Sequence, residues 1–209
     1  MKEKDNESKD RLLYVAMAEF AEKGYRGATL RSMGARAGVT AALYNYHFKS
    51  KERLAEAVVA ELKSKLNVPS VGDHSAIDSD AAWRAALRSF IESVVDVFTS
   101  TEEPYCYFAP LYRHESAAVA MKKTSLHDAC LVPIFNELES LVSMGVASGD
   151  AREIRLWSLA LWNLVLAYAL KDPRRVAAYV PEGLSPEAFK AQTLDFMVNQ
   201  TLSGLKFGR

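Results

Sequence analysis

Apolar residues recur at three- and four-residue spacing through most of the chain, and this is the period of an amphipathic helix. Between residues 80 and 100, for example, Trp83, Leu87, Phe90 and Phe98 fall on one helical face. No segment alternates apolar and polar residues as a half-buried strand does. The pattern therefore predicts an all-α fold, with helices over 8–23, 29–37, 40–48, 50–66, 80–100, 116–144, 151–170 and 186–204.

A polar loop is predicted at 67–79, where Pro69 and Gly72 interrupt a run of small residues. This loop separates two predicted domains, 1–66 and 67–209. The helix at 50–66 would then link the smaller N-terminal domain to the larger C-terminal one.

Three further segments are predicted to depart from regular helix. Residues 1–8 are charged and lack periodicity, which indicates a flexible arm. Proline removes a backbone donor and crowds the preceding turn. We therefore expect a kink or a short helical piece at Pro110, and a kink or break at Pro133.

Residues 29–48 have the pattern of two short helices joined by a tight turn. Thr29 and Thr40 are each placed to cap a helix N-terminus with their hydroxyl groups. Gly38 stands at the end of the first helix, where a positive φ is often needed. The pattern is typical of a helix-turn-helix, although two such helices also occur in ordinary all-α cores.

The surroundings of this pattern resemble the TetR family of bacterial transcriptional regulators over roughly residues 8–60. The matching residues are Phe20, Gly24-Tyr25, Ala28-Thr29-Leu30, Ala37-Gly38-Val39-Thr40, Asn45-Tyr46-His47-Phe48 and Lys49-Ser50-Lys51-Glu52. The resemblance implies an N-terminal helix-turn-helix DNA-binding domain, followed by a larger helical domain for ligand binding and dimerisation.

The family resemblance also implies which residues meet DNA. Ala41, Ala42, Leu43 and Asn45 match positions that face the major groove, and the Asn45 amide is suited to adenine. The residues that match phosphate-contacting positions are Thr29, Tyr46, His47 and Lys51, although Tyr46 and His47 could instead pack against the first helix. Arg31 is expected to reach either a phosphate or a base, and Thr40, the cap of the recognition helix, completes the implied DNA-binding set.

Tyr44 departs from the family pattern, which has a buried aliphatic residue at this position. Either its ring is accommodated in the small core, or the local register differs from the assignment above. The two alanines also offer few hydrogen-bond donors, so thymine methyl groups and DNA shape would carry more of the specificity.

The charge distribution agrees with a DNA-binding end. The 209-residue chain has a formal net charge of zero, but residues 1–53 carry eleven basic and seven acidic side chains. A basic end on an otherwise acidic body suits a protein that presents one face to phosphates.

Aromatic side chains in the C-terminal helices suggest a pocket for an apolar or aromatic effector, because small-molecule sites are mostly apolar with a few polar groups. For any single residue, ordinary core is the competing interpretation. The predicted ligand-binding residues are Trp83, Phe90, Phe98, Phe108, Tyr112, His114, Phe135, Trp162 and Asn163.

The segment 151–170 is apolar almost all round, so it must bury one face in its own domain and another against a partner. Together with 186–204 it would form a four-helix bundle in a homodimer. The predicted interface residues are Trp157, Leu161, Leu164, Phe189, Phe196 and Gln200.

Other classes of protein are disfavoured. The N-terminus is charged and lacks a signal sequence, and no apolar run reaches the ~20 residues that span a membrane. Cys106 and Cys130 are the only cysteines, and without a secretory context we expect both to be reduced thiols. We therefore expect a cytoplasmic protein. No HExxH, GxSxG, phosphate loop or paired CxxC occurs. We expect no catalytic residues, metal site or cofactor.

These observations predict a homodimeric repressor that binds double-stranded DNA at an inverted-repeat operator and is released by a small apolar or aromatic effector. The alternative is a helical dimeric adaptor or scaffold without sequence-specific DNA binding.

Overall fold

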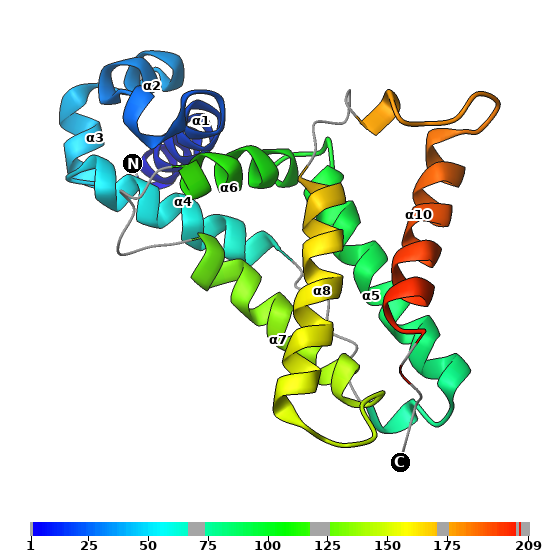
Figure 1. Cartoon of the computed structure of the whole chain (residues 1–209). Coiled ribbons are helices and arrows are strands. Elements are labelled where there is room, and N and C mark those ends of the chain that lie inside the picture. Colours follow the sequence, from blue (N-terminus) through cyan, green and yellow to red (C-terminus); the bar gives the residue numbers. More distant parts are fainter. Residues whose placement is uncertain (1, 67–73, 118–125, 171–175, 204, 206–209) are drawn as a thin grey trace. The chain divides into compact units, whose positions relative to one another are not determined.

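The computed structural model of the chain describes residues 2–66, 74–117, 126–170, 176–203 and 205 (Figure 1). Helices make up the fold, and no strand occurs in these ranges. The chain divides into two compact units, Met1–Asn67 with Ser100–Leu131, and Val68–Thr99 with Val132–Arg209. We call them unit 1 and unit 2. The functional boundary between residues 66 and 67 stays a prediction.

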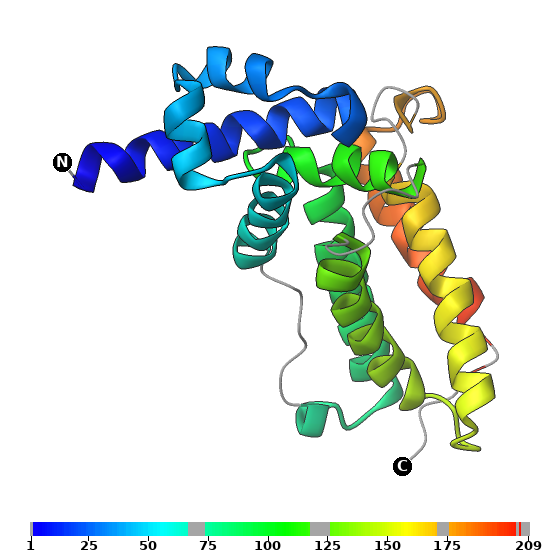
Figure 2. The ribbon, with the colours of Figure 1, turned by 90° about the vertical axis from the view of Figure 1, so that its left-hand side faces the viewer.

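Unit 1 is built around its first helix, which contacts most other elements of the unit (Figures 1 and 2). Phe20, Met33, Leu54 and Phe108 are among its buried core residues. Its elements are α1 (Lys2–Gly27), α2 (Leu30–Ala37), α3 (Ala41–His47), α4 (Lys51–Lys65), the 3₁₀ turn η2 (Tyr105–Tyr107), α6 (Phe108–Ala117) and the π-helical turn η3 (His127–Leu131).

Unit 2 is a bundle in which α5 packs against α7, α8 and α10, and α8 packs against α7 and α10 (Figures 1 and 2). The Trp83 indole N–H donates to the Leu141 carbonyl at 2.7 Å. Gly145 leaves room for that ring, because a Cβ there would lie 2.2 Å from it. The elements are η1 (His74–Ala76), α5 (Asp80–Thr99), α7 (Val132–Ser143), α8 (Ala151–Ala169) and α10 (Pro186–Thr201).

Most predicted helices are confirmed within a few residues, but the N-terminal arm needs correction. The flexible arm predicted at 1–8 is wrong for residues 2–8, because α1 already begins at Lys2. Gly24 interrupts α1 with a non-helical φ of 69° and ψ of 168°, close to its predicted end. Of the two alternatives predicted at Pro110, the short helical piece is found, because α6 has ten residues and follows the turn η2. Pro110 lies in the first turn of α6, where the missing backbone donor has no intrahelical acceptor.

The long helix predicted at 116–144 is also divided. Residues 118–125 lie outside the described ranges, and η3 then gives way to α7 at Val132. The π-helical turn thus changes to an α-helix at Val132, one residue before Pro133, where a kink or break was expected. Of the predicted loop 67–79, residues 67–73 lie outside the described ranges, and η1 occupies three of the others. Within the described residues, every helix is too short or too polar to cross a membrane.

Candidate nucleic-acid interface

The turn between α2 and α3 has the predicted capping geometry. The Thr29 and Thr40 hydroxyl oxygens accept hydrogen bonds from the backbone N–H groups of Ser32 and Leu43, at 3.1 and 3.3 Å. Gly38 is left-handed, with φ 63° and ψ 32°. Residues 29–47 therefore form a helix-turn-helix, and the predicted caps and turn are confirmed.

The short helix α3 has a buried side and an exposed side. Tyr44 is 4% exposed and packs against Phe48, with ring centroids 6.4 Å apart. This resolves the two alternatives, because the ring is accommodated in the small core and the register is the expected one. Leu43 and His47 are half-buried, while the exposed side consists of Ala41, Ala42, Asn45 and Tyr46.

The exposed side of α3 is continued by other predicted contact residues. Thr29, Arg31 and Thr40 are all exposed. Tyr46 is 70% exposed, and its ring meets the His47 imidazole edge-on at 5.1 Å. These side chains are therefore accessible from solvent, and their contacts to DNA stay a prediction.

Lys51 is the exception among the predicted contact residues. Its ammonium group donates to the Ala28 carbonyl at 2.5 Å and lies 4.6 Å from the centre of the Tyr25 ring. Burial lowers the pKa of this amine, with an opposing effect from Glu52. The Lys51 side chain is engaged within unit 1, so its role at a phosphate stays a prediction.

A buried acidic residue behind α2 was missed by sequence analysis. Glu19 has no exposed surface and accepts hydrogen bonds from Lys23, Ser32 and Arg36. Burial would raise the pKa of this carboxyl group, but the three donors outweigh it and lower the pKa to about 2. The available signal was a glutamate within the apolar stripe of α1, between Ala18 and Phe20.

The predicted ligand-binding residues are distributed over both units. Phe108, Tyr112 and His114 belong to unit 1, and the other six belong to unit 2. Trp83 and Phe108 are completely buried core residues. Phe135 and Trp162 meet edge-on at 6.0 Å, whereas Asn163 is exposed on α8.

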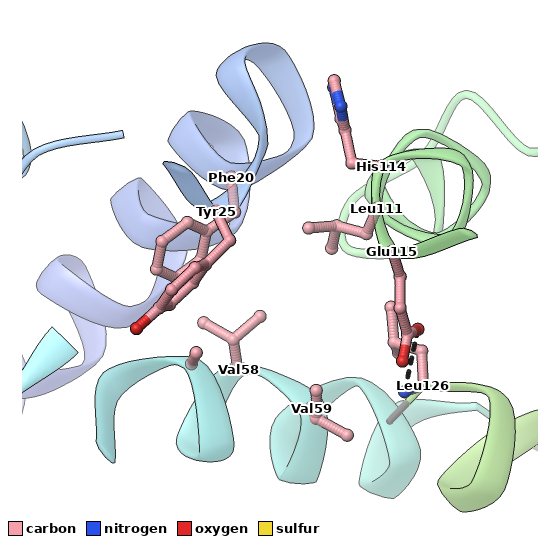
Figure 3. A pocket seen from close by; sticks show the side chains of 9 residues that line it. Phe20, Tyr25, Val58, Val59, Leu111, His114, Glu115 and Leu126 are labelled. Atoms are coloured by element: carbon pink, nitrogen blue, oxygen red, sulfur yellow. Dashed lines mark hydrogen bonds between the residues drawn. The ribbon is translucent and has the colours of Figure 1, made fainter. Parts of the chain in front are cut away.

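The described residues of each unit line a pocket. The pocket in unit 1 encloses about 30 Å³ between α1, α4 and α6, enough for a water molecule but not for a larger ligand (Figure 3). His114 is the one predicted ligand residue in its lining, which consists of Phe20, Tyr25, Ala55, Val58, Val59, Leu111, His114, Glu115 and Leu126.

The pocket in unit 2 is open and has a volume of about 430 Å³, within the usual size range of small-molecule sites. None of the predicted ligand residues lines it. Its lining is mostly apolar, with polar groups at Thr99, Tyr168, Glu187 and Lys190, and comprises Thr99, Tyr168, Val176, Ala177, Val180, Pro186, Glu187 and Lys190. Periodicity predicts burial but not shape, so sequence analysis missed this pocket.

The predicted interface residues on α8 and α10 differ in exposure. Leu164 and Phe196 are 42% and 65% exposed, and Gln200 is also exposed. Trp157 and Phe189 are half-buried. The prediction of Leu161 as an interface residue is wrong, because its side chain is completely buried within unit 2. Leu156, 68% exposed on α8, was missed.

Comparison with known proteins identifies the N-terminal domain. Residues 12–58, which contain the helix-turn-helix, match the family model described as bacterial regulatory proteins, tetR family. The helix-turn-helix segment of the chain is therefore of the TetR type. The resemblance found in the sequence over residues 8–60 is confirmed.

A TetR-type relative with a similar sequence is the HTH-type transcriptional repressor KstR2 of Mycolicibacterium smegmatis, which is 36% identical over 53 residues. The matched segment covers 25% of this chain and 26% of KstR2. The chain thus spans about a quarter of the length of this relative.

Solved structures of TetR-type regulators share the fold of the whole chain. A TetR-family regulator from Mesorhizobium loti has a TM-score of 0.64 at 19% identity, covering 97% of this chain and 98% of its own. AibR, crystallised with isovaleryl coenzyme A and operator DNA, has a TM-score of 0.64 at 16% identity, with coverages of 92% and 97%. At these identities the likeness concerns the fold.

Proposed function

We propose that this protein is a ligand-responsive transcriptional repressor that binds an inverted-repeat operator as a homodimer. One observation carries the proposal: the TetR-family helix-turn-helix exposes Asn45 and Tyr46 on α3 while Tyr44 and Phe48 hold that helix in the core. A short helix presented in this way fits the DNA major groove.

The proposed contacts on α3 are few and of different kinds. The Asn45 amide can donate to and accept from the edge of an adenine base. Ala41 and Ala42 would offer methyl groups to thymine, while the exposed side chains of Thr29, Arg31 and Tyr46 would contact phosphates. A surface with one amide and two methyl groups favours an operator that is rich in A·T pairs.

Dimerisation through α8 and α10 is supported by their exposed apolar residues. Leu156, Leu164 and Phe196 would be costly to leave in water, and the two helices pack beside each other. Two copies joined here would present two α3 helices. To enter successive major grooves, these helices must lie roughly 34 Å apart.

The effector is proposed to bind in unit 2. Support comes from the open pocket beside Tyr168 and from the aromatic pair Phe135 and Trp162. Binding would favour a conformation that is unsuited to DNA. A difference in ligand affinity of about 1–3 kcal/mol between the two states would weaken operator binding about 5- to 150-fold.

Selection of duplexes from a random library by the purified protein tests the proposal. A recovered inverted repeat should bind tightly in fluorescence anisotropy, and its affinity should fall steeply with salt. Asn45→Ala should weaken this binding about five- to hundredfold, because one bidentate base contact is lost. Asn136→Ala, which removes another exposed amide, on α7, is the matched control and should change nothing.

The adaptor alternative gives a different result. A folded dimer that enriches no sequence, and that binds neither specific nor scrambled duplexes at low salt, would contradict the regulator and favour the adaptor.

A further inference from the structure

Glu19 of α1 forms a contact with both ends of α2. Its Oε1 atom accepts from the Ser32 hydroxyl at 2.8 Å and from Arg36 Nη1 at 3.2 Å. Ser32 lies in the first turn of α2 and Arg36 in the last. We call these residues, together with Lys23, the Glu19 cluster.

The Glu19 cluster fixes α2 in two ways. Because Ser32 and Arg36 are four residues apart, they lie on the same face of α2, one turn above each other. Hydrogen bonds from both to one buried oxygen therefore set the rotation of α2 about its axis and its distance from α1. Arg36 also pairs with Glu22 Oε2 at 3.2 Å, a second acceptor on α1.

The position of α2 is passed on to α3 through a short and well-bonded turn. The Gly38 N–H donates to the Ala35 carbonyl at 3.3 Å, and the Val39 N–H donates to the Gly34 carbonyl at 2.9 Å. A Cβ at Gly34 would lie 3.0 Å from the Val39 oxygen, so the backbones are already in close contact. A rotation of α2 would therefore move α3 with it.

We infer that Glu19 is a positioning residue for operator recognition, which holds α2 and α3 at a fixed orientation on α1. The inference rests on the proposed function and extends it to a side chain that cannot itself touch DNA. A hydrocarbon at this position would pack equally well but would not specify one orientation, whereas hydrogen bonds have fixed directions. The same bonds keep the Arg36 guanidinium on α1.

The inference predicts that specificity and stability change separately. Lys23 and Arg36 are nearly half exposed, so water solvates both groups when Glu19 is replaced, and leucine keeps an apolar side chain in the core. Glu19→Leu should therefore remain folded with a urea midpoint that is lowered only modestly, while binding to the selected duplex weakens at least about tenfold. Binding to a scrambled duplex of the same composition should stay within about twofold, because phosphate contacts tolerate reorientation.

Two further variants complete the test. Glu19→Gln keeps one acceptor oxygen for Ser32 and should lose less specificity than Glu19→Leu. Lys23→Ala removes a partner of the same carboxylate that lies on α1 itself, 2.8 Å away, and leaves the two α2 contacts in place. It is the matched control and should retain the specificity of the wild type.

Hydrogen exchange supplies a measurement that needs no DNA. Glu19→Leu should accelerate the exchange of backbone amides in α2 and α3, with unit 2 unaffected. An unchanged ratio of specific to scrambled affinity in folded Glu19→Leu would overturn the inference. A parallel loss of stability and of binding to both duplexes would overturn it as well. Failure of the wild-type protein to select any sequence would instead contradict the proposed function, and the exchange experiment would still test the fixing of α2.

Discussion

The Lys51 ammonium group donates a hydrogen bond to the Ala28 carbonyl oxygen at 2.5 Å. This bond joins the first turn of α4 to the junction of α1 and α2, and the Tyr25 ring covers the same ammonium group. We expect Lys51→Ala to lower the free energy of unfolding by about 1.5–3 kcal/mol, as for other hydrogen bonds to charged groups. Urea denaturation followed by circular dichroism measures this change.

Arg53→Ala is the matched control for Lys51→Ala. Arg53 has the same charge on the same helix, but its side chain is 71% exposed and pairs only locally, with Glu56. Its loss should change stability by less than about 1 kcal/mol. If both variants unfold alike, the Lys51 contact is not formed in solution, and its ammonium group is available to a phosphate.

Lys51 also illustrates which features the sequence predicts. Thr29, Gly38 and Thr40 act on backbone groups within three or four residues, so their roles follow from local sequence alone. The partner of Lys51 is 23 residues away and that of Glu19 is 13 or 17 residues away. Such contacts depend on how helices cross, which helical periodicity does not specify.

The predicted ligand-binding residues show the same limit. Trp83 and Phe90 are buried, as their place on one apolar helix face indicates, but their role in ligand binding stays a prediction. Whether a buried face packs tightly or leaves a cavity depends on several helices together. Thr99 and Lys190, which line the open pocket of unit 2, come from α5 and α10, two helices that are distant in sequence.

Tyr44→Phe tests the packing of α3. The Tyr44 hydroxyl is buried and has no hydrogen-bond partner among the described residues, and burial together with Glu52 raises its pKa to about 12. Removing an unsatisfied buried hydroxyl should leave stability unchanged or raise it by about 1 kcal/mol. Operator affinity should not change, because the ring does not face DNA.

Urea denaturation measures the stability of Tyr44→Phe, and fluorescence anisotropy with the selected duplex measures its operator affinity. Tyr46→Phe is the control, since its ring is 70% exposed. A loss of more than about 1 kcal/mol in Tyr44→Phe would mean that the hydroxyl has a partner in solution.

Gly24→Ala tests the contact between α1 and α6. Gly24 has φ 69° and ψ 168°, a conformation that side chains rarely adopt, and a Cβ there would lie 3.1 Å from His114 Nδ1. Backbone strain alone should lower the free energy of unfolding by about 1–3 kcal/mol. The crowding of His114 should add to this loss.

A double-mutant cycle with His114→Ala separates the two causes of this loss. Gly24→Ala should be less destabilising in the His114→Ala background than in the wild type, by the part that is due to crowding. The backbone part should remain. Equal effects in the two backgrounds would show that His114 moves aside without loss.

The exposed apolar face of α8 and α10 predicts how the proposed dimer can be dissociated. Leu164→Glu combined with Phe196→Glu places four carboxylates in the interface of a symmetric dimer. The dissociation constant should rise at least about a hundredfold, because burial of each such side chain contributes about 1.5–3 kcal/mol. Sedimentation velocity at several concentrations measures it. Ala85→Glu, at an exposed position on α5, is the control and should remain dimeric.

The Glu19 carboxyl group predicts a specific dependence of stability on pH. Its pKa falls from an ordinary 4.5 to about 2 in the folded protein, so the folded state binds fewer protons than the unfolded state between these values. Its contribution to stability is complete above about pH 5 and is lost as the pH falls toward 2. Glu19→Gln lacks this contribution at every pH.

The difference in unfolding free energy between the wild type and Glu19→Gln should therefore shrink between pH 6 and about pH 3. This difference should change by at most about 3 kcal/mol over the titration. We expect a smaller change, because Lys23 and Arg36 are nearly half exposed and their charges are screened by solvent. Urea titrations at each pH measure the difference, so the other acidic groups cancel. Glu22→Gln is the control, because Glu22 shares Arg36 but is 55% exposed, and its difference should vary little. A constant difference for Glu19→Gln would mean that its carboxylate is not held by Ser32 and Arg36 in solution.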